Sequence, residues 1–164
     1  MSPDTSADDP ERACALPPAG AGAGVATGTA LLSLAELVAW GENFGRSVRA
    51  PCIVALDGDL GAGKTTLVQA IARGYGVTAS VTSPTFALVH EYGGGGATVY
   101  HLDLYRLHDA RELLYIGWNE IVEREALVLI EWPDRAGGAL PATAIHLALA
   151  HVPNDHEHRL LTRR

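Results

Sequence analysis

The residues best suited to chemistry form one run, Gly58-Asp59-Leu60-Gly61-Ala62-Gly63-Lys64-Thr65, which fits the G-x-x-x-x-G-K-[ST] pattern of a phosphate-binding loop. Its glycines allow the backbone to curl so that successive N–H groups point at phosphate oxygens. Lys64, the only lysine in the chain, supplies a compact charge for the β- and γ-phosphates, and the hydroxyl of Thr65 can ligate Mg²⁺. The pattern predicts a nucleotide site built from Asp59, Leu60, Gly61, Ala62, Gly63, Lys64, Thr65 and Thr66.

Two acidic residues follow apolar runs that are typical of buried strands. Glu131 comes directly after 127–130, and Asp103 comes directly after 99–102. Ligands of open α/β sheets bind at the carboxyl ends of the strands. We therefore expect Glu131 to bind Mg²⁺, directly or through water, and Asp103 to act as a second acid near the metal or to orient water. The alternative for each is a strand-end acid that faces solvent.

Two further features allow more than one interpretation. Thr82, Ser83 and Thr85 surround Pro84, so this segment is either a switch that touches the γ-phosphate or an ordinary Ser-Pro turn. Trp132 is either an exposed anchor for a partner or a residue packed at the edge of the core, and the second is slightly favoured. The seven histidines are scattered and give no metal-binding spacing.

The elements around the phosphate loop have the order that the motif requires. The apolar, β-branched run 52–56 predicts a buried strand. The run 66–73 predicts a helix that ends at Gly74 or Gly76. A strand, a loop and a helix in this order present the helix N-terminus to the phosphates.

The remaining pattern alternates helices and strands early and adds a hairpin and further strands later. A helix is predicted from the capping-box residue Ser33 to about 48, followed after the phosphate-loop helix by strands 86–92 and 98–104, which glycines 93–96 join. Short helices are predicted at 111–115, capped by Asp109, and at 119–125. Strands are predicted at 126–130 and 145–149, separated by an interruption of regular structure at Pro133 and 137–138, and a weak strand is predicted at 159–162. This order predicts an α/β domain whose sheet is partly parallel and partly antiparallel.

Composition separates residues 1–30 from the rest of the 164-residue chain. The first 30 residues are rich in Asp, Ser, Pro, Ala and Gly, which predicts a disordered tail before a single domain at 31–164. Neither a secretory signal nor a membrane-spanning stretch is evident. Cys14 lies in the tail and Cys52 in a buried strand, which argues against a disulfide and for a reducing cytoplasm.

Charge limits the contacts that the chain makes with nucleic acid. The 12 basic and 19 acidic residues give a formal net charge of −7. A large phosphate-backbone footprint needs clustered Lys and Arg. We therefore expect any role in a nucleic-acid pathway to depend on a protein partner.

Several of these motifs together resemble one family, the bacterial TsaE ATPases of tRNA threonylcarbamoyladenosine synthesis. The matching segments are the phosphate loop 56–66, Thr-Ser-Pro-Thr-Phe at 82–86, His-Leu-Asp-Leu-Tyr-Arg-Leu at 101–107, Glu-Leu at 112–113 before Gly117, and Leu-Ile-Glu-Trp-Pro at 129–133. They occur in the family's order and spacing over about 33–149. The resemblance implies a P-loop NTPase-like three-layer fold.

The resemblance also implies an activity and partners. Members bind ATP with Mg²⁺, release ADP, and dock on the TsaB–TsaD heterodimer, which modifies adenosine 37 of ANN-decoding tRNAs; hydrolysis resets that complex. By position, Lys64, Asp103 and Glu131 would be catalytic, Thr65 and Glu131 would hold Mg²⁺, and Trp132 would be a needed neighbour. The segment 82–85 would be a switch-like loop.

The resemblance further matches Ser33 and Arg159 to nucleotide contacts made from the family's N-terminal helix and C-terminal region. The chain departs from the family in its longer N-terminal extension, in its glycine run at 93–96 and after residue 149. These departures affect the contacts near the chain ends and leave the central motifs intact.

Three other functions are compatible with a phosphate loop. A small-molecule kinase needs an acceptor pocket and usually an arginine-bearing lid, for which Arg106, Arg111 and Arg124 are too dispersed. A GTPase needs an Asn-Lys-x-Asp motif, which a chain whose only lysine is Lys64 cannot contain. A nucleotide-gated adaptor would bind ATP without hydrolysing it, and Asp103 and Glu131 argue for hydrolysis.

Overall fold

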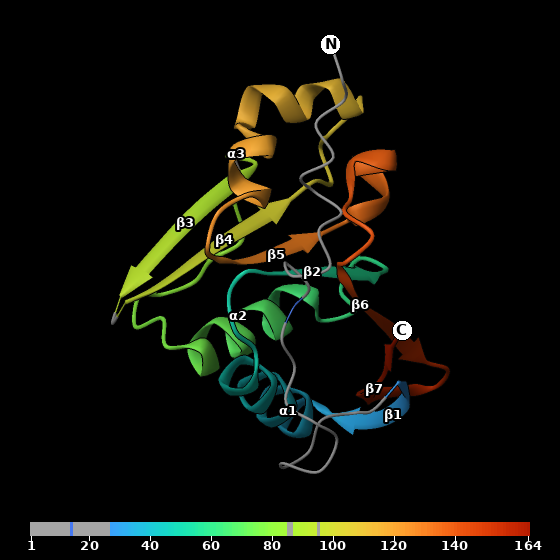
Figure 1. The fold of residues 1–164 in the computed structure, drawn as a ribbon. Helices are drawn as coiled ribbons and strands as arrows, with labels where there is room; N and C mark the ends of the chain where they lie inside the picture. Colours follow the sequence, from blue (N-terminus) through green and yellow to red (C-terminus); the bar gives the residue numbers. More distant parts are fainter. Residues whose placement is uncertain (1–13, 15–26, 85–86, 95) are drawn as a thin grey trace.

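One mixed sheet of seven strands organises the computed structural model, in the order β1-β7-β6-β2-β5-β4-β3 (Figure 1). The structure describes residues 14, 27–84, 87–94 and 96–164. The elements in chain order are β1 (Gly28–Ser33), α1 (Leu34–Ser47), β2 (Cys52–Gly58), α2 (Lys64–Tyr75), β3 (Val89–Gly94), β4 (Ala97–Asp103), η3 (Ala110–Ile116), α3 (Trp118–Val122), β5 (Leu127–Glu131), η4 (Pro133–Ala139), β6 (Ile145–Val152) and β7 (Asp155–Arg163).

The centre of the sheet is parallel and its two ends are antiparallel. β2 pairs in parallel with β5 and β6, and β5 pairs in parallel with β4. β3 closes one end as a hairpin with β4, while β7 runs antiparallel to both β6 and β1 at the other end. The predicted α/β fold with a mixed sheet is confirmed.

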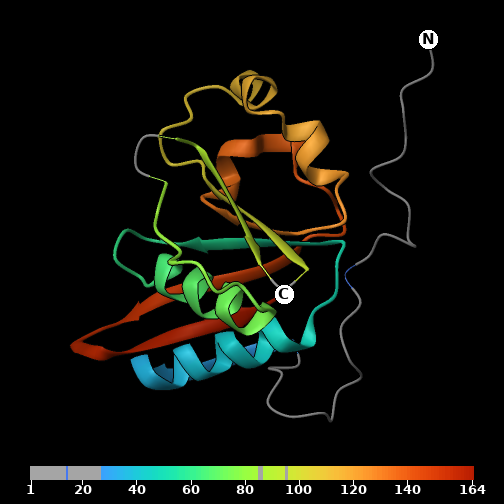
Figure 2. The same cartoon turned by 90° about the vertical axis from the view of Figure 1, so that its left-hand side faces the viewer.

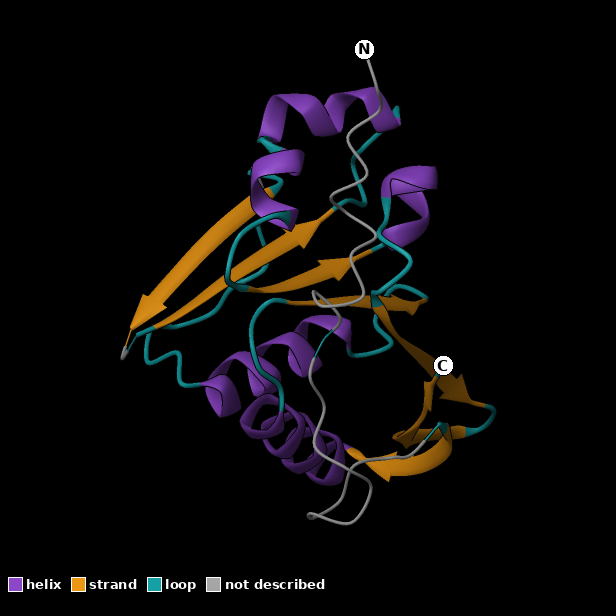
Figure 3. Ribbon diagram, viewed as in Figure 1, coloured by secondary structure: helices purple, strands orange, loops and turns teal. Residues whose placement is uncertain are grey.

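Helices cover both faces of the sheet and make three layers. α1 and α2 lie on one face, and η3, α3 and η4 lie on the other (Figures 2 and 3). β5 is buried along its whole length because its side chains alternate between two cores. Leu127 and Leu129 pack on the α1–α2 side, and Val128 and Ile130 pack on the opposite side.

The helices begin and end where local chemistry requires. The side chain of Ser33 accepts from the backbone N–H of Glu36, and the Glu36 carboxylate accepts from the backbone N–H of Ser33, which confirms the predicted capping box. α2 ends at Gly76, one of the two predicted stops, which adopts a left-handed φ of 112°. Asp109 caps η3 as predicted and Gly117 ends it, although the element is a 3-10 helix.

The structure corrects several predicted boundaries. Residues 28–30, which we assigned to the tail, belong to β1, so the folded part begins before residue 31. β7 is a full strand of nine residues rather than a weak one at 159–162, because it lies between β1 and β6 and both neighbours pair with it. A short helix, η4, forms where we predicted only an interruption of regular structure. The first hairpin strand begins at Val89, and residues 85–86 lie outside the described part.

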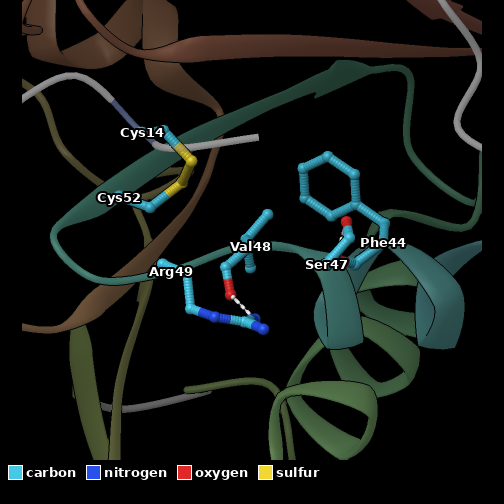
Figure 4. The surroundings of a disulfide bond; sticks show 6 residues. All are labelled: Cys14, Phe44, Ser47, Val48, Arg49 and Cys52. Carbon is cyan, nitrogen blue, oxygen red and sulfur yellow. Dashed lines mark hydrogen bonds between the residues drawn. A yellow bond between two sulfur atoms is a disulfide. The ribbon is translucent and has the colours of Figure 1, made fainter. Parts of the chain in front are cut away.

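A disulfide joins Cys14 to Cys52, so the prediction that these cysteines stay unpaired was wrong (Figure 4). The prediction placed Cys14 in a disordered tail, away from the buried strand of Cys52, whereas the Cα atoms of the two cysteines are 4.4 Å apart. Cys14 packs against the core cluster on the α1–α2 side, and Cys52 begins β2 there. The cysteine argument for a reducing compartment therefore fails. Among the described residues, the helices are too short or too polar to cross a bilayer.

Candidate functional site

The phosphate loop connects the end of β2 to the start of α2. Gly61 and Gly63 have φ values of 75° and 104°, a left-handed conformation that glycine adopts without strain. Gly63 is also the N-cap of α2, and no side chain caps its first turn. The free N–H groups and the positive end of the helix dipole are therefore available to an anion.

Lys64 is held inside this loop and is 5% exposed. Its ammonium group donates to the backbone carbonyls of Gly58 at 2.6 Å and Asp59 at 2.8 Å. It also lies 4.1 Å from the centroid of the Trp132 ring, within cation–π range. Burial lowers the pKa of Lys64, although nearby carboxylates, Glu131 foremost, act to raise it.

Thr65 and Glu131 meet directly although they are 66 residues apart in the chain. The Thr65 hydroxyl lies 3.0 Å from Oε1 and 3.2 Å from Oε2 of Glu131, whose side chain is almost fully buried. A hydroxyl and a carboxylate are oxygen donors of the kind that Mg²⁺ prefers, so these two residues could hold the ion together. Among the described residues, no cluster of three His, Cys, Asp or Glu side chains offers a rival metal site.

His101 is a site residue that the sequence analysis missed. It is fully buried in β4, and its Nε2 lies 2.9 Å from Oε1 of Glu131. The signal that could have revealed it is strand alternation, because residues two apart in a strand share a face and His101 lies two residues before Asp103.

Asp103 lies beside Glu131 and faces the predicted switch segment. The two acids are paired in the β4–β5 register. Asp103 accepts from the Ser83 hydroxyl at 3.2 Å and from the backbone N–H of Tyr105 at 3.1 Å. The structure thus brings Ser83 to the acidic pair.

Thr82, the neighbour of Ser83, is held from the hairpin. The Tyr92 hydroxyl accepts from its backbone N–H at 3.1 Å and donates to its carbonyl at 3.0 Å. The Thr82 residue itself is exposed. Thr85, the third predicted hydroxyl, lies outside the described residues.

An open groove of about 560 Å³ lies beside the phosphate loop and contains the two predicted end contacts. Ser33, at the start of α1, and Arg159, on β7, line it together with Gly61, Gly63 and Thr66. Arg159 donates to the carbonyls of 156 and 158 and is only partly buried. The volume of the groove lies within the range of small-molecule sites.

A sequence profile for the threonylcarbamoyl adenosine biosynthesis protein TsaE matches residues 31–160. The chain belongs to this family. A tRNA threonylcarbamoyladenosine biosynthesis protein TsaE from Haemophilus influenzae is 45% identical over 93 residues, which span 57% of this chain and 59% of that protein. The protein of the same name from Treponema pallidum is 37% identical over 117 residues, 71% of this chain and 86% of that protein.

The fold has a solved counterpart in the crystal structure of Bacillus subtilis YdiB. The superposition has a TM-score of 0.68 at 24% sequence identity and covers 85% of this chain and 87% of that chain. The likeness supports the fold of this TsaE-family protein. The residues of the phosphate loop, the acidic pair and the groove all lie within the 31–160 match.

Trp132 contributes to the interior of the site in this TsaE-family protein. It has a left-handed φ of 58°, which is uncommon for a residue other than glycine. Its ring contacts that of Tyr105 at a centroid distance of 4.9 Å and lies over the ammonium of Lys64. The indole is partly buried against the core, in line with the favoured interpretation of a core-edge residue.

Proposed function

We propose that this protein is a Mg²⁺-dependent ATPase that supports formation of the threonylcarbamoyl group on adenosine 37 of ANN-decoding tRNAs. It would act by binding the TsaB–TsaD complex and resetting it between turnovers. Membership of the TsaE family supports the pathway. The contact between Thr65 and Glu131, which joins the phosphate loop to a strand-end carboxylate, is the observation that carries the ATPase proposal.

Each residue of the site has a distinct role in this proposal. The amides of 59–66 and the ammonium of Lys64 would bind the β- and γ-phosphates. Thr65 and Glu131 would hold Mg²⁺, which neutralises phosphate charge. Asp103, held by Ser83 and by the backbone of Tyr105, would orient the attacking water.

Lys64 must exchange partners when a triphosphate binds. It now donates to the carbonyls of Gly58 and Asp59, and phosphate oxygens would replace them as acceptors. The groove lined by Ser33 and Arg159 would receive the base and ribose. ADP would leave by the same route after hydrolysis.

The tRNA would be reached through protein partners rather than directly. The net charge of −7 disfavours a phosphate-backbone footprint. TsaD and TsaB homologues would therefore carry the RNA contacts. Tight, salt-sensitive binding of tRNA by this chain alone would contradict this part of the proposal.

Phosphate release from ATP, measured with and without TsaB and TsaD, tests the proposal. We expect slow release by the chain alone and faster release when both partners are added. Lys64→Ala and Glu131→Gln should each lower the rate by about 100-fold, because each removes about 3 kcal/mol of stabilisation of the transferring group. Glu125→Gln, an exposed carboxylate before β5, is the matched control and should keep the wild-type rate.

Two outcomes would replace the ATPase proposal by its alternatives. Transfer of phosphate to a small metabolite instead of water would identify a kinase. ATP-dependent binding to TsaB–TsaD without phosphate release would identify a nucleotide-gated adaptor.

Equal rates of phosphate release for Glu131→Gln and the wild type would remove Glu131 from the metal site.

A further inference from the structure

His101 and Glu131 form a buried pair in the centre of the candidate site. His101 is 0% exposed and Glu131 is 3% exposed. Nε2 of His101 lies 2.9 Å from Oε1 of Glu131. The two residues lie on adjacent parallel strands, and Leu129, two residues before Glu131, is the register partner of His101. Both side chains therefore project from the sheet face on which α2 lies.

The direction of this hydrogen bond follows from the groups that form it. An ionised carboxylate only accepts, so Nε2 of His101 must carry the proton and donate. Nδ1 of His101 is buried and has no partner among the described residues. A proton on Nδ1 would create a buried donor without an acceptor, so the Nε2–H tautomer satisfies the pair best.

Two donors from different elements thus hold one carboxylate. His101 donates from β4, and Thr65 donates from the first turn of α2. Two donors on separate elements restrict the rotation of the carboxylate group, which has several rotamers when free. A ligating carboxylate that is hydrogen-bonded in this way is already oriented before the metal arrives.

We propose that His101 is a positioning residue, which aims the Glu131 carboxylate at Thr65 so that the two can hold a divalent cation together. This inference rests on the proposed function, since it assigns a partner to the proposed metal ligand. The alternative is a core histidine whose only role is packing. The two differ in what they require of the residue, because positioning needs a donor at the place of Nε2 and packing needs only volume.

Binding of the non-hydrolysable analogue AMP-PNP at a series of MgCl₂ concentrations tests the inference by calorimetry. His101→Ala should raise the Mg²⁺ concentration at half-maximal binding by about tenfold or more, the usual cost of losing a partner of a metal ligand. Affinity for AMP-PNP in EDTA should stay within about twofold, since the phosphate loop is unchanged. His108→Ala, at an exposed histidine before η3, should match the wild type.

Two conservative variants separate positioning from packing. The amide nitrogen of Gln can occupy the place of Nε2, whereas that of Asn reaches only the place of Nδ1. His101→Gln should therefore have a Mg²⁺ concentration at half-maximal binding close to that of the wild type. His101→Asn should show the same raised concentration as His101→Ala. This comparison also decides the question if His101→Ala does not fold.

Three results would overturn the inference. The first is a Mg²⁺ concentration at half-maximal binding that is the same for His101→Ala and the wild type. The second is an equal rise of this concentration in His101→Gln and His101→Asn. The third is an affinity of His101→Ala for AMP-PNP in EDTA that falls as much as its affinity with Mg²⁺. Binding is measured separately from phosphate release. If the wild type binds AMP-PNP in a Mg²⁺-dependent way but does not hydrolyse ATP, the ATPase proposal is refuted and the role of His101 stands. If the wild type binds AMP-PNP equally well with and without Mg²⁺, the role of His101 is refuted.

Discussion

Asp103 and Glu131 are direct partners in the parallel register of β4 and β5, so two carboxylates leave the sheet side by side at its C-terminal edge. Their hydrogen-bond donors differ. Glu131 is held by Thr65 of the phosphate loop and is buried, whereas Asp103 is held by Ser83 and is partly exposed. The buried acid suits a metal, and the more accessible acid suits a water molecule.

Asp103→Asn should slow hydrolysis while leaving nucleotide binding intact. We expect a loss of at least about 100-fold in kcat, the lower end of what a positioned acid or base contributes. Affinity for ATP with Mg²⁺ should stay within about twofold, because Asp103 is not expected to contact either of them directly. Single-turnover phosphate release and calorimetry give the two numbers. A loss of affinity that matches the loss of rate would place Asp103 among the metal ligands instead.

Lys64→Met should unfold at the same temperature as the nucleotide-free wild type or at a higher one. Burial lowers the pKa of Lys64, so the folded chain binds this proton less tightly than the unfolded chain. The resulting cost is fully present at pH values below the lowered pKa, and it declines as the pH rises through that pKa. Met keeps the apolar stem and removes the charge.

The same variant should lose its response to ATP. Nucleotide that binds only the folded state raises the unfolding temperature of the wild type by mass action. We expect no such rise for Lys64→Met in a thermal scan with ATP and Mg²⁺. A drop of several degrees without nucleotide would mean that the hydrogen bonds of Lys64 to Gly58 and Asp59 outweigh the cost of its burial.

The sequence was sufficient to locate the phosphate loop and the two acids, because short-range rules govern them. The loop has a fixed spacing of glycines around Lys64. Glu131 and Asp103 each end an apolar run, and parallel strands share one C-terminal edge, so both acids were expected near the loop. The capping box at Ser33 is likewise a local pattern.

The features that the sequence left hidden depend on contacts between distant segments. His101 lies in the middle of a strand, and only the β4–β5 register brings it to Glu131. β7 has the pattern of a partly exposed strand, and its pairing with β1 and β6 is what makes it long. Cys14 is bonded to Cys52 across a separation of 38 residues, and composition does not encode this contact.

Gly45→Ala should destabilise the fold although alanine is the better helix former. A Cβ atom at Gly45 would clash with the carbonyl oxygen of Ile71 and lie 2.8 Å from the backbone nitrogen of Tyr75. Gly74 faces Glu42 of α1 in the same way, so glycines set the close approach of α1 and α2. We expect a loss of about 2 kcal/mol or more, since overpacking outweighs the gain in helix propensity.

Gly138→Ala is the matched control for this prediction. A Cβ atom at Gly138 would meet nothing within 4 Å. Its free energy of unfolding should stay within about 0.5 kcal/mol of the wild type, as for most surface substitutions. Urea unfolding measures both variants. Equal stability of Gly45→Ala and Gly138→Ala would show that the two helices can separate at little cost.

Reduction of the Cys14–Cys52 disulfide should lower the free energy of unfolding. The bond closes a loop of 38 residues, and the loop-entropy relation gives about 4 kcal/mol of stabilisation for a loop of this length. Cys14→Ser is the better test variant because Cys52 is 2% exposed, so its replacement would also disturb the core. Urea unfolding with and without dithiothreitol should show a loss for the wild type and none for Cys14→Ser. Two thiols that react with maleimide in the unreduced native protein, or coincident curves for all four samples, would exclude the bond as a source of stability.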